Sequence, residues 1–339
     1  MYKIKKDGID ALFDRLDEKY DLFLPVGDSY KRYEKGDKQS ERTNTVRSPK
    51  DFFFPQTEDM MKFKVAGKKI ELTDIRTEKD DFIIFGVRAC DCKSFDVLDR
   101  VFLSEPADSY YAEKREHGVI VTEACRRPSE TCFCQSFGID PSEPGGDISV
   151  WRDDEYIYLK PNTEKGEKTL SNVFETLEKA DENDIKPIKD EIKKILDRLP
   201  LKDVKTDGFG AGVTDELFDR PEWEQLSQSC LGCGTCTFVC PTCQCYDIKD
   251  CKTKDGVLRY RCWDSCMYTE FTKMSAGQPR LTQKERFRQR FMHKLVYFPE
   301  NNGGVFGCVG CGRCVTSCPI SMNIVKVIKT LGGKNDRQK

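Results

Sequence analysis

Two segments of the chain carry the same cysteine pattern, in which three cysteines are spaced by two residues and a fourth precedes a proline. Both read C-x₂-C-x₂-C-x₃-C-P, the first starting at Cys230 and the second at Cys308. Three thiolates this close together can bind three irons of one cubane cluster, whose fourth iron needs a cysteine from elsewhere in the chain. The pattern therefore predicts two [4Fe-4S] clusters, which carry out one-electron transfer.

The expected ligands follow from an exchange between the two motifs. In two-cluster ferredoxins the cysteine before the proline binds the cluster of the other motif. We therefore expect cluster one on Cys230, Cys233, Cys236 and Cys318, and cluster two on Cys308, Cys311, Cys314 and Cys240. Four glycines inside the motifs would let backbone N–H groups approach the cluster sulfurs and tune the potential: Gly232, Gly234, Gly310 and Gly312.

A zinc ribbon is the competing interpretation, because zinc sites are also built from C-x₂-C pairs. Two such pairs would supply the four ligands that zinc needs. They would leave unexplained the third cysteine at the same spacing and the C-x₃-C-P ending, each of which occurs twice. The sequence therefore favours iron–sulfur clusters.

The remaining ten of the 18 cysteines form less regular groups. Four of them follow or end expected strands, where loops could converge, and predict a third [4Fe-4S] cluster: Cys90, Cys125, Cys132 and Cys134. Scattered buried thiols, or zinc on the same four residues, are the alternatives. Three others could ligate a metal, cradle a cluster or only pack: Cys243, Cys245 and Cys266. We expect no ligand role for Cys92, Cys251 and Cys262.

Composition restricts the class of protein in which these motifs occur. The chain has 339 residues, of which 38% are hydrophobic, and a net charge of −2. Its longest apolar run, Phe82–Val87, is far too short to cross a bilayer, and its first residues lack the apolar stretch of a secretory signal. Without export the cysteines do not form a disulfide framework. We therefore expect a cytoplasmic protein, without membrane association, whose thiolates bind metal.

Charge and cysteine content differ between the two parts of the chain. Residues 221–339 carry a net charge of about +8 and residues 1–220 about −10, and all but five cysteines lie from Cys230 onward. This asymmetry predicts an α+β protein of two domains: residues 1–205, of mixed helix and strand with the extra cysteine site, and residues 222–339, a mostly helical two-cluster ferredoxin-like domain. A glycine- and proline-containing linker is expected at residues 206–221.

Hydrophobic periodicity predicts the elements that must position the cysteines. Apolar residues recur at helical spacing in residues 7–20, with Asp7 as the expected cap, and in residues 185–199, with Pro187 in the first turn. Two further segments are expected to be helical, residues 272–296 and 321–331. Buried strands are expected at residues 82–87 and 119–122, and hairpins at residues 64–72 and 148–159.

Several sites expected of a self-sufficient redox enzyme are missing from the sequence. It has no G-x-G-x-x-G after a strand and no P-loop, and only two histidines, so we expect flavin and nicotinamide on a separate partner protein. The basic segment 280–294 is expected either to dock an acidic partner or to form a solvated helix face. It carries no fold signature for nucleic acid, so no nucleic-acid partner is expected.

Five stretches occur in the order found in one known family. They are Arg88-Ala-Cys90-Asp91, Cys125 with Thr131-Cys132-Phe-Cys134-Gln-Ser, Cys240-Pro-Thr-Cys243-Gln-Cys245-Tyr, Trp263-Asp-Ser-Cys266 and Cys308-Val-Gly-Cys-Gly-Arg-Cys314. As a set they resemble the iron–sulfur component of the anaerobic sulfite reductase, known as its A-type component. The beta subunit of the soluble archaeal sulfhydrogenases is similar over the same span, about residues 80–325. The resemblance also favours Cys90 over Cys92 as a ligand.

The resemblance implies an iron–sulfur electron-transfer subunit that is not catalytic alone. It would relay electrons from an FAD- and NAD(P)H-binding partner to a siroheme sulfite-reducing subunit. The alternative within the resemblance is a beta subunit of a soluble sulfhydrogenase, whose catalytic partner holds nickel and iron. An alternative of another class is a metal-stabilised interaction module without a redox role.

Overall fold

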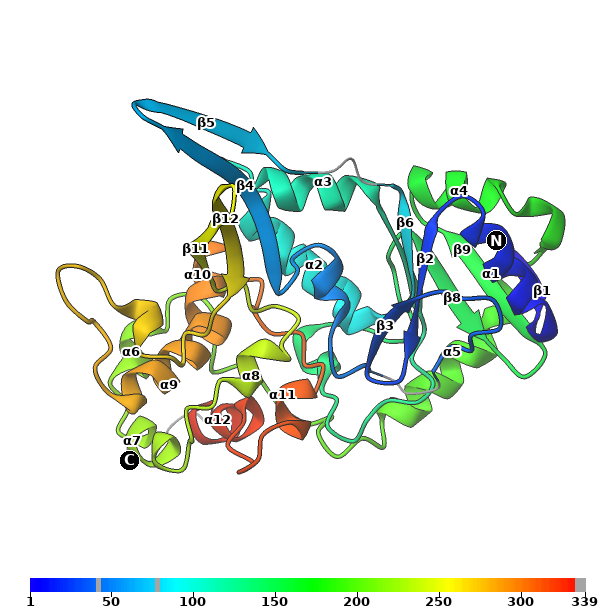
Figure 1. Ribbon diagram of the computed structural model, residues 1–339. Helices are drawn as coiled ribbons and strands as arrows, with labels where there is room; N and C mark the ends of the chain where they lie inside the picture. The colour runs from blue at the N-terminus through cyan, green and yellow to red at the C-terminus, as the bar shows by residue number, and fades with distance from the viewer. Residues whose placement is uncertain (41–43, 77–79, 333–339) are drawn as a thin grey trace, which may run out of the picture.

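The computed structural model describes residues 1–40, 44–76 and 80–332. An eight-stranded sheet with its helices forms one side of the molecule, and short helices form the other side, with a four-stranded sheet between and above them (Figure 1). This arrangement confirms the expected α+β class. None of the described helices is long and apolar enough to cross a membrane. The expected cytoplasmic location stays a prediction.

The large sheet has parallel strands at its centre and antiparallel strands toward its edges. Across the sheet its strands are β10 (Glu178–Lys179), β1 (Tyr2–Lys5), β9 (Tyr156–Pro161), β8 (Ile148–Arg152), β7 (Gly118–Glu123), β6 (Phe82–Arg88), β2 (Asp21–Val26) and β3 (Ser29–Arg32). Strands β8, β7, β6 and β2 are mutually parallel. Strand β6 is buried along its whole length, as expected of a parallel strand covered on both faces. The two predicted strands and the 148–159 hairpin are therefore confirmed.

Helices cover both faces of this sheet because its side chains alternate in direction. Ile83 and Phe85 pack with α1 (Ile9–Asp17) and α4 (Glu164–Ser171) on one face. On the other face Ile84 packs with α2 (Ala89–Phe102) and α3 (Ser109–His117), and Trp151 packs with α5 (Glu182–Leu196). The sheet thus fixes where α2 begins and where the loop after β7 starts.

Two helix starts differ from the prediction. A 3₁₀ turn, Lys6–Gly8, precedes α1, so Gly8 rather than Asp7 occupies the cap position and provides no side-chain cap. Helix α5 begins three residues before the expected start, because Asp181 and Asp184 form a capping box. Pro187 therefore lies inside the helix, beyond its first turn.

The smaller sheet joins the two parts of the chain. It contains β4 (Thr57–Ala66) and β5 (Lys69–Asp74), which confirm the predicted hairpin at 64–72, and an unpredicted hairpin of β11 (Tyr246–Thr253) and β12 (Gly256–Trp263). Strand β12 pairs antiparallel with β4, so that Val257 lies opposite Phe63 and Cys262 opposite Thr57. The segment between the two cysteine motifs is thus part strand, and the outer hairpin β4–β5 projects from the molecule (Figure 1).

The C-terminal part is built from short helices around its own core. They are α6 (Thr214–Phe218), α7 (Glu222–Gln228), α8 (Thr235–Phe238), α9 (Gln283–Met292) with a π-helical turn His293–Tyr297, α10 (Phe298–Asn301), α11 (Arg313–Thr316) and α12 (Ile324–Leu331). Helices α9 and α12 begin later than expected, at residues capped by Thr282 and Asn323. Phe209 and Leu217, from the expected linker, are buried in this core. The domain bounds stay a prediction, and residues 333–339 lie outside the described residues.

Candidate metal centres

Both cysteine motifs fold into the same loop, in which the first cysteine accepts a backbone hydrogen bond. The Gly232 N–H donates to Cys230 Sγ, and the Gly310 N–H donates to Cys308 Sγ, each at 3.5 Å. Each loop then leads into a one-turn helix, α8 or α11, that carries the third cysteine of the motif. The N–H contacts expected from the glycines are therefore present, and such contacts to ligand sulfur stabilise the thiolate and tune a bound cluster.

The four cysteines expected for cluster two line one small cavity. They are Cys240, Cys308, Cys311 and Cys314. Burial raises the pKa of Cys308 to about 12, and the neighbouring charges of Cys314 and Cys240 contribute to the rise. Thiols this deeply buried release their protons readily only when a cation or metal balances the charge. The structure therefore brings this ligand set together, and its assignment to a cluster stays a prediction.

The cysteines expected for cluster one lie near the same cavity. Burial raises the pKa of Cys236 to about 11, and the nearby charges of Cys314 and Cys230 act in the same direction. Cys233 is exposed and its thiol donates to Thr235, while the Cys318 thiol donates to the carbonyl of Met322. Cys230 and Cys236 thus lie within electrostatic reach of each other, and Cys236 adjoins the second set through Cys314.

Two buried cations between the motifs fit an anionic cluster. Arg290 on α9 is 2% exposed, and its Nε and Nη1 have no hydrogen-bond partner among the described residues. Its Nη2 donates to the Cys236 carbonyl at 3.2 Å. Lys294 is also buried, and burial lowers its pKa less than the thiolates of Cys240 and Cys243 raise it. A buried, incompletely paired guanidinium is costly, so a negative group is required beside it. Thiolates with a bound iron–sulfur cluster would provide that charge.

This finding corrects the prediction for the basic segment 280–294. The segment is not a solvated or docking face, because Arg286, Arg290 and Lys294 are buried. Arg286 donates to the carbonyls of Arg280 and Leu281. The signal available in the sequence was the helical spacing of Arg286, Arg290 and Lys294, four residues apart, which places them on one helix face.

The third cysteine set converges from three loops of the N-terminal part. Cys90 lies in the first turn of α2, Cys125 follows β7, and Cys132 and Cys134 lie in the loop leading to a 3₁₀ helix, Cys134–Phe137. All four are buried. Burial raises the pKa of Cys134 to about 12, with contributions from Cys132 and Cys125, and Cys134 in turn contributes to the raised pKa of Cys90. The structure therefore brings the four thiols together, and cluster binding there stays a prediction.

The second motif docks directly on this third set, which the sequence did not indicate. The Phe133 N–H donates to the Gly310 carbonyl at 2.9 Å, and the Cys132 thiol lies 3.9 Å from the Cys311 carbonyl oxygen. Arg313 of α11 forms a two-point ion pair with Asp91 in the first turn of α2. At the position of Arg313 the first motif has Thr235. That difference between the repeats is the only signal that could have shown which motif contacts the N-terminal part.

Gly310 lies at the closest approach of these two segments, and alanine should not fit there. A Cβ on Gly310 would lie 2.5 Å from the Phe133 carbonyl oxygen, at a backbone φ of +59°. We expect Gly310→Ala to lower the free energy of unfolding by about 2 to 5 kcal/mol, because backbone strain and overpacking add. Urea-induced unfolding under anaerobic conditions measures this difference.

Gly303 is the matched control, because its φ is +63° and no atom lies within 4 Å of a Cβ built there. We expect Gly303→Ala to cost only about 1 to 2 kcal/mol, from backbone strain alone. Equal losses in the two variants would show that the contact between Gly310 and Phe133 is not tight.

The remaining cysteines divide as the sequence left them. Cys243, Cys245 and Cys266 line one small cavity with Arg290 and Lys294. Hydrogen bonds pair the thiols of Cys245 and Cys266 and those of Cys243 and Cys240. Among the described residues no three His, Cys, Asp or Glu side chains converge closely enough to hold a single metal ion. Metal ligation by this group therefore stays a prediction. Cys251 and Cys262 lie on β11 and β12, and Cys92 on α2.

Comparison with known proteins agrees with the cysteine pattern. Residues 229–322 match a family described as the 4Fe-4S dicluster domain. Over 333 residues, which are 96% of this chain and 96% of the relative, the sequence is 32% identical to "Sulfhydrogenase 2 subunit beta" of Pyrococcus furiosus. No solved structure matches the chain. The two [4Fe-4S] clusters predicted from the motifs are therefore supported by a domain family as well as by spacing.

Proposed function

Because the chain belongs to the family of sulfhydrogenase beta subunits, we propose that it is the electron relay between a flavin-containing partner and a catalytic partner of one oxidoreductase complex. Its iron–sulfur centres would exchange single electrons with both partners. The chain itself would supply the thiolate ligands, the N–H donors and the buried cations that set their potentials. No catalytic step on a substrate is assigned to this chain.

The order of the three cysteine sets is the observation that supports a relay. Cys90 of the third set lies beside Cys311 of the second set, whose Cys314 lies beside Cys236 of the first set. Neighbouring sets share electrostatic contacts, so the three form a row. We therefore place the third set at one end of the path, Cys308, Cys311, Cys314 and Cys240 in the middle, and Cys230, Cys233, Cys236 and Cys318 at the other end.

Buried cations along this row would reduce the cost of adding an electron. Arg290 and Lys294 lie among the thiols of the first two sets, and Arg313 lies beside Cys311 and Cys90. Each added electron increases the negative charge at a site of low dielectric constant, where a nearby cation is worth more than in water. The protein thereby stabilises the reduced centres without a protein-derived proton transfer.

Two catalytic partners are consistent with the sequence, and one is favoured. The relative that matches along almost the whole chain is a sulfhydrogenase subunit, so we propose as partners a hydrogenase catalytic protein and one that binds FAD and NAD(P)H. The five cysteine-containing stretches also resemble the A-type component of the anaerobic sulfite reductase, which makes a siroheme protein the second candidate. Purification of the native complex, followed by assays of hydrogen-dependent NAD(P)⁺ reduction and NAD(P)H-dependent sulfite reduction, distinguishes the two.

Iron and acid-labile sulfide per chain are the first test of the relay. With three cubanes we expect about twelve irons and twelve sulfides per chain after anaerobic purification, because each cluster contains four of each. EPR of the dithionite-reduced protein should then show interacting S = 1/2 centres. About eight of each would leave the two motifs as ferredoxin sites and remove the third set from the path. Zinc without sulfide would support the interaction module and refute electron transfer.

A further inference from the structure

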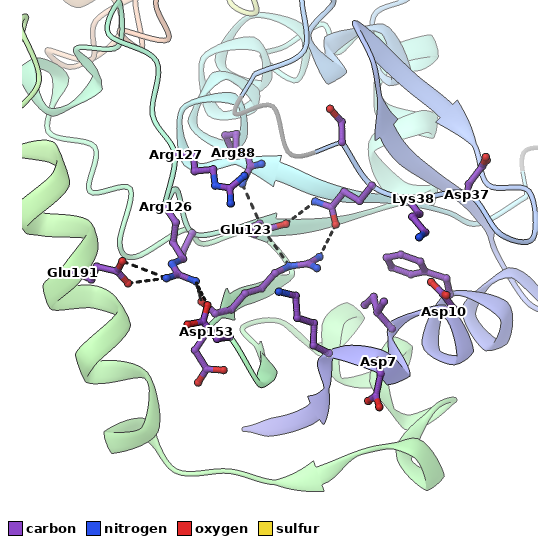
Figure 2. Close-up of a pocket in the computed structure, with 18 residues that line it drawn as sticks. Asp7, Asp10, Asp37, Lys38, Arg88, Glu123, Arg126, Arg127, Asp153 and Glu191 are labelled. Carbon is purple, nitrogen blue, oxygen red and sulfur yellow. Dashed lines mark hydrogen bonds and ion pairs between the residues drawn. The ribbon is translucent and has the colours of Figure 1, made fainter.

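A large cavity opens at the carboxyl ends of three parallel strands, away from the cysteine row. Arg88, Glu123 and Arg152 are the last residues of β6, β7 and β8, and all three line it. Its volume is about 690 Å³, within the usual range for small-molecule sites. In open sheets with parallel strands and helices on both faces, ligands bind outside the carboxyl ends of the strands. The position and size of the cavity are therefore those of a binding site (Figure 2).

The centre of this cavity is basic. Six cationic side chains line it: Lys6, Lys38, Arg88, Arg126, Arg127 and Arg152. They come from the N-terminal turn, the loop after β3, and the ends of β6, β7 and β8 with the loop after β7. Residues so far apart in sequence meet only because the sheet order places these segments side by side.

The carboxylates that line the cavity do not balance these cations at its centre. Glu123 is shared by two arginines, with Arg88 Nη1 at 3.6 Å and Arg152 Nε at 3.2 Å, and it also accepts a hydrogen bond from Gln39 at 2.6 Å. Burial raises the pKa of Glu123, but Arg152 and Arg88 lower it more, so it stays ionised. Two guanidinium groups facing one carboxylate leave an excess positive charge at the floor of the cavity.

The other acidic side chains are used at the edge. Asp153 accepts hydrogen bonds from the N–H groups of Glu155 and Tyr156, which close the β8–β9 turn. Glu191 of α5 forms a two-point ion pair with Arg126. Figure 2 shows the carboxylates of Asp7 and Asp37 turned away from Glu123. An anion that entered the cavity would therefore meet cations before it met carboxylates.

We propose that this cavity binds the phosphate groups of a small molecule, of the diphosphate class. Phosphate oxygens accept the charge-assisted hydrogen bonds that arginine donates in pairs, and several cations are needed to balance a diphosphate. Ile9 and Phe13 line the same cavity and provide apolar surface for the remainder of the molecule. This binding activity is separate from electron transfer along the cysteine row and does not depend on it.

Titration calorimetry on the full chain with its clusters tests the proposal. Pyrophosphate and ADP are the probes, at constant ionic strength, because exposed charges are screened by salt. We expect saturable one-to-one binding of at least one probe. Arg127→Ala and Lys6→Ala should each weaken it about tenfold, the loss typical of one hydrogen bond to a charged group. Tighter binding of ADP would indicate a nucleotide as the ligand, and equal or tighter binding of pyrophosphate a simpler phosphate ester; both support the site.

Arg259→Ala is the matched control, because Arg259 lies on β12 in the smaller sheet and pairs with Asp250. It should leave the affinity unchanged within about twofold, since its charge lies far outside the cavity. Arg127→Lys keeps the charge but loses the two-point geometry, and should bind better than Arg127→Ala if that variant has folded correctly. Failure of both probes to bind, or binding that Arg127→Ala and Lys6→Ala do not change, overturns the proposal. Iron content is expected to be the same in all variants, so this result is independent of the relay test.

Discussion

Replacement of Arg313 by methionine is expected to lower the free energy of unfolding by about 3 to 5 kcal/mol, the loss typical when one partner of a buried ion pair is removed. The side chains of Arg313 and Asp91 are 4% and 1% exposed, and their two hydrogen bonds measure 2.5 and 2.7 Å. Without the guanidinium, the Asp91 carboxylate would remain charged and buried. Anaerobic urea unfolding of the cluster-containing chain measures the effect.

Two further variants show whether the loss comes from the unpaired carboxylate. The double variant Arg313→Met with Asp91→Ala removes both charges, and should recover at least about 2 kcal/mol relative to Arg313→Met. Arg259→Met removes an arginine from an ion pair with Asp250 whose side chains are both 41% exposed, and should cost less than about 1 kcal/mol. A double variant as unstable as Arg313→Met would mean that packing, not charge, accounts for the loss.

This ion pair also explains why the two cysteine motifs are not equivalent. Arg313 Nε donates to the Thr45 carbonyl at 2.7 Å, so the residue contacts two separate segments of the N-terminal part. Thr235, the corresponding residue of the first motif, instead lies beside Cys233 at the surface. The second motif is therefore the one held against Cys90 and Cys134, and the first faces away from them. A single residue that differs between the repeats thus decides the order of the row.

The elements that the sequence predicted well are those with a strong local signal. Residues 82–87 form one uninterrupted apolar run, which only a covered strand can bury, and α5 shows apolar residues at helical spacing. The start of α5 was misplaced because the Asp181–Asp184 capping box precedes the first apolar residue of the pattern. The cysteine motifs were recognised with their spacing intact, since their chemistry is encoded within eleven residues.

Features that depend on distant contacts were not predicted. The β11–β12 hairpin has a turn signal at Asp255-Gly256, but β11 is almost wholly exposed and its sheet is completed by β4, about 190 residues earlier. Arg313 and Asp91 are separated by 222 positions, and neither residue type is unusual at a surface. The basic cavity likewise needs the sheet order before its six cations can be recognised as neighbours. Periodicity gives elements, but pairing between elements is a property of the whole chain.

The largest functional effect is expected from removal of one thiol of the third set. We expect Cys132→Ala to lower the iron content from about twelve to about eight per chain, with an equal loss of sulfide, because a cubane held by three protein ligands at a buried site has an open iron. The S = 1/2 signal of the reduced protein should lose the spin coupling that comes from this centre. Electron transfer between the flavin partner and the two ferredoxin motifs should fall to background if the third set lies at the end of the path.

Cys92→Ala is the matched control, because Cys92 belongs to the same helix as Cys90 but packs against the core of the large sheet. Burial raises its pKa to about 11, and its thiol bonds to Thr122 rather than to another cysteine. Its removal should leave iron, sulfide and the EPR signal unchanged. If Cys132→Ala and Cys92→Ala both keep all their iron, the third set is only a group of buried thiols. If both lose four irons, the loss reflects a damaged domain rather than a missing ligand, and Cys125→Ala then separates the two causes by whether the large sheet still unfolds cooperatively.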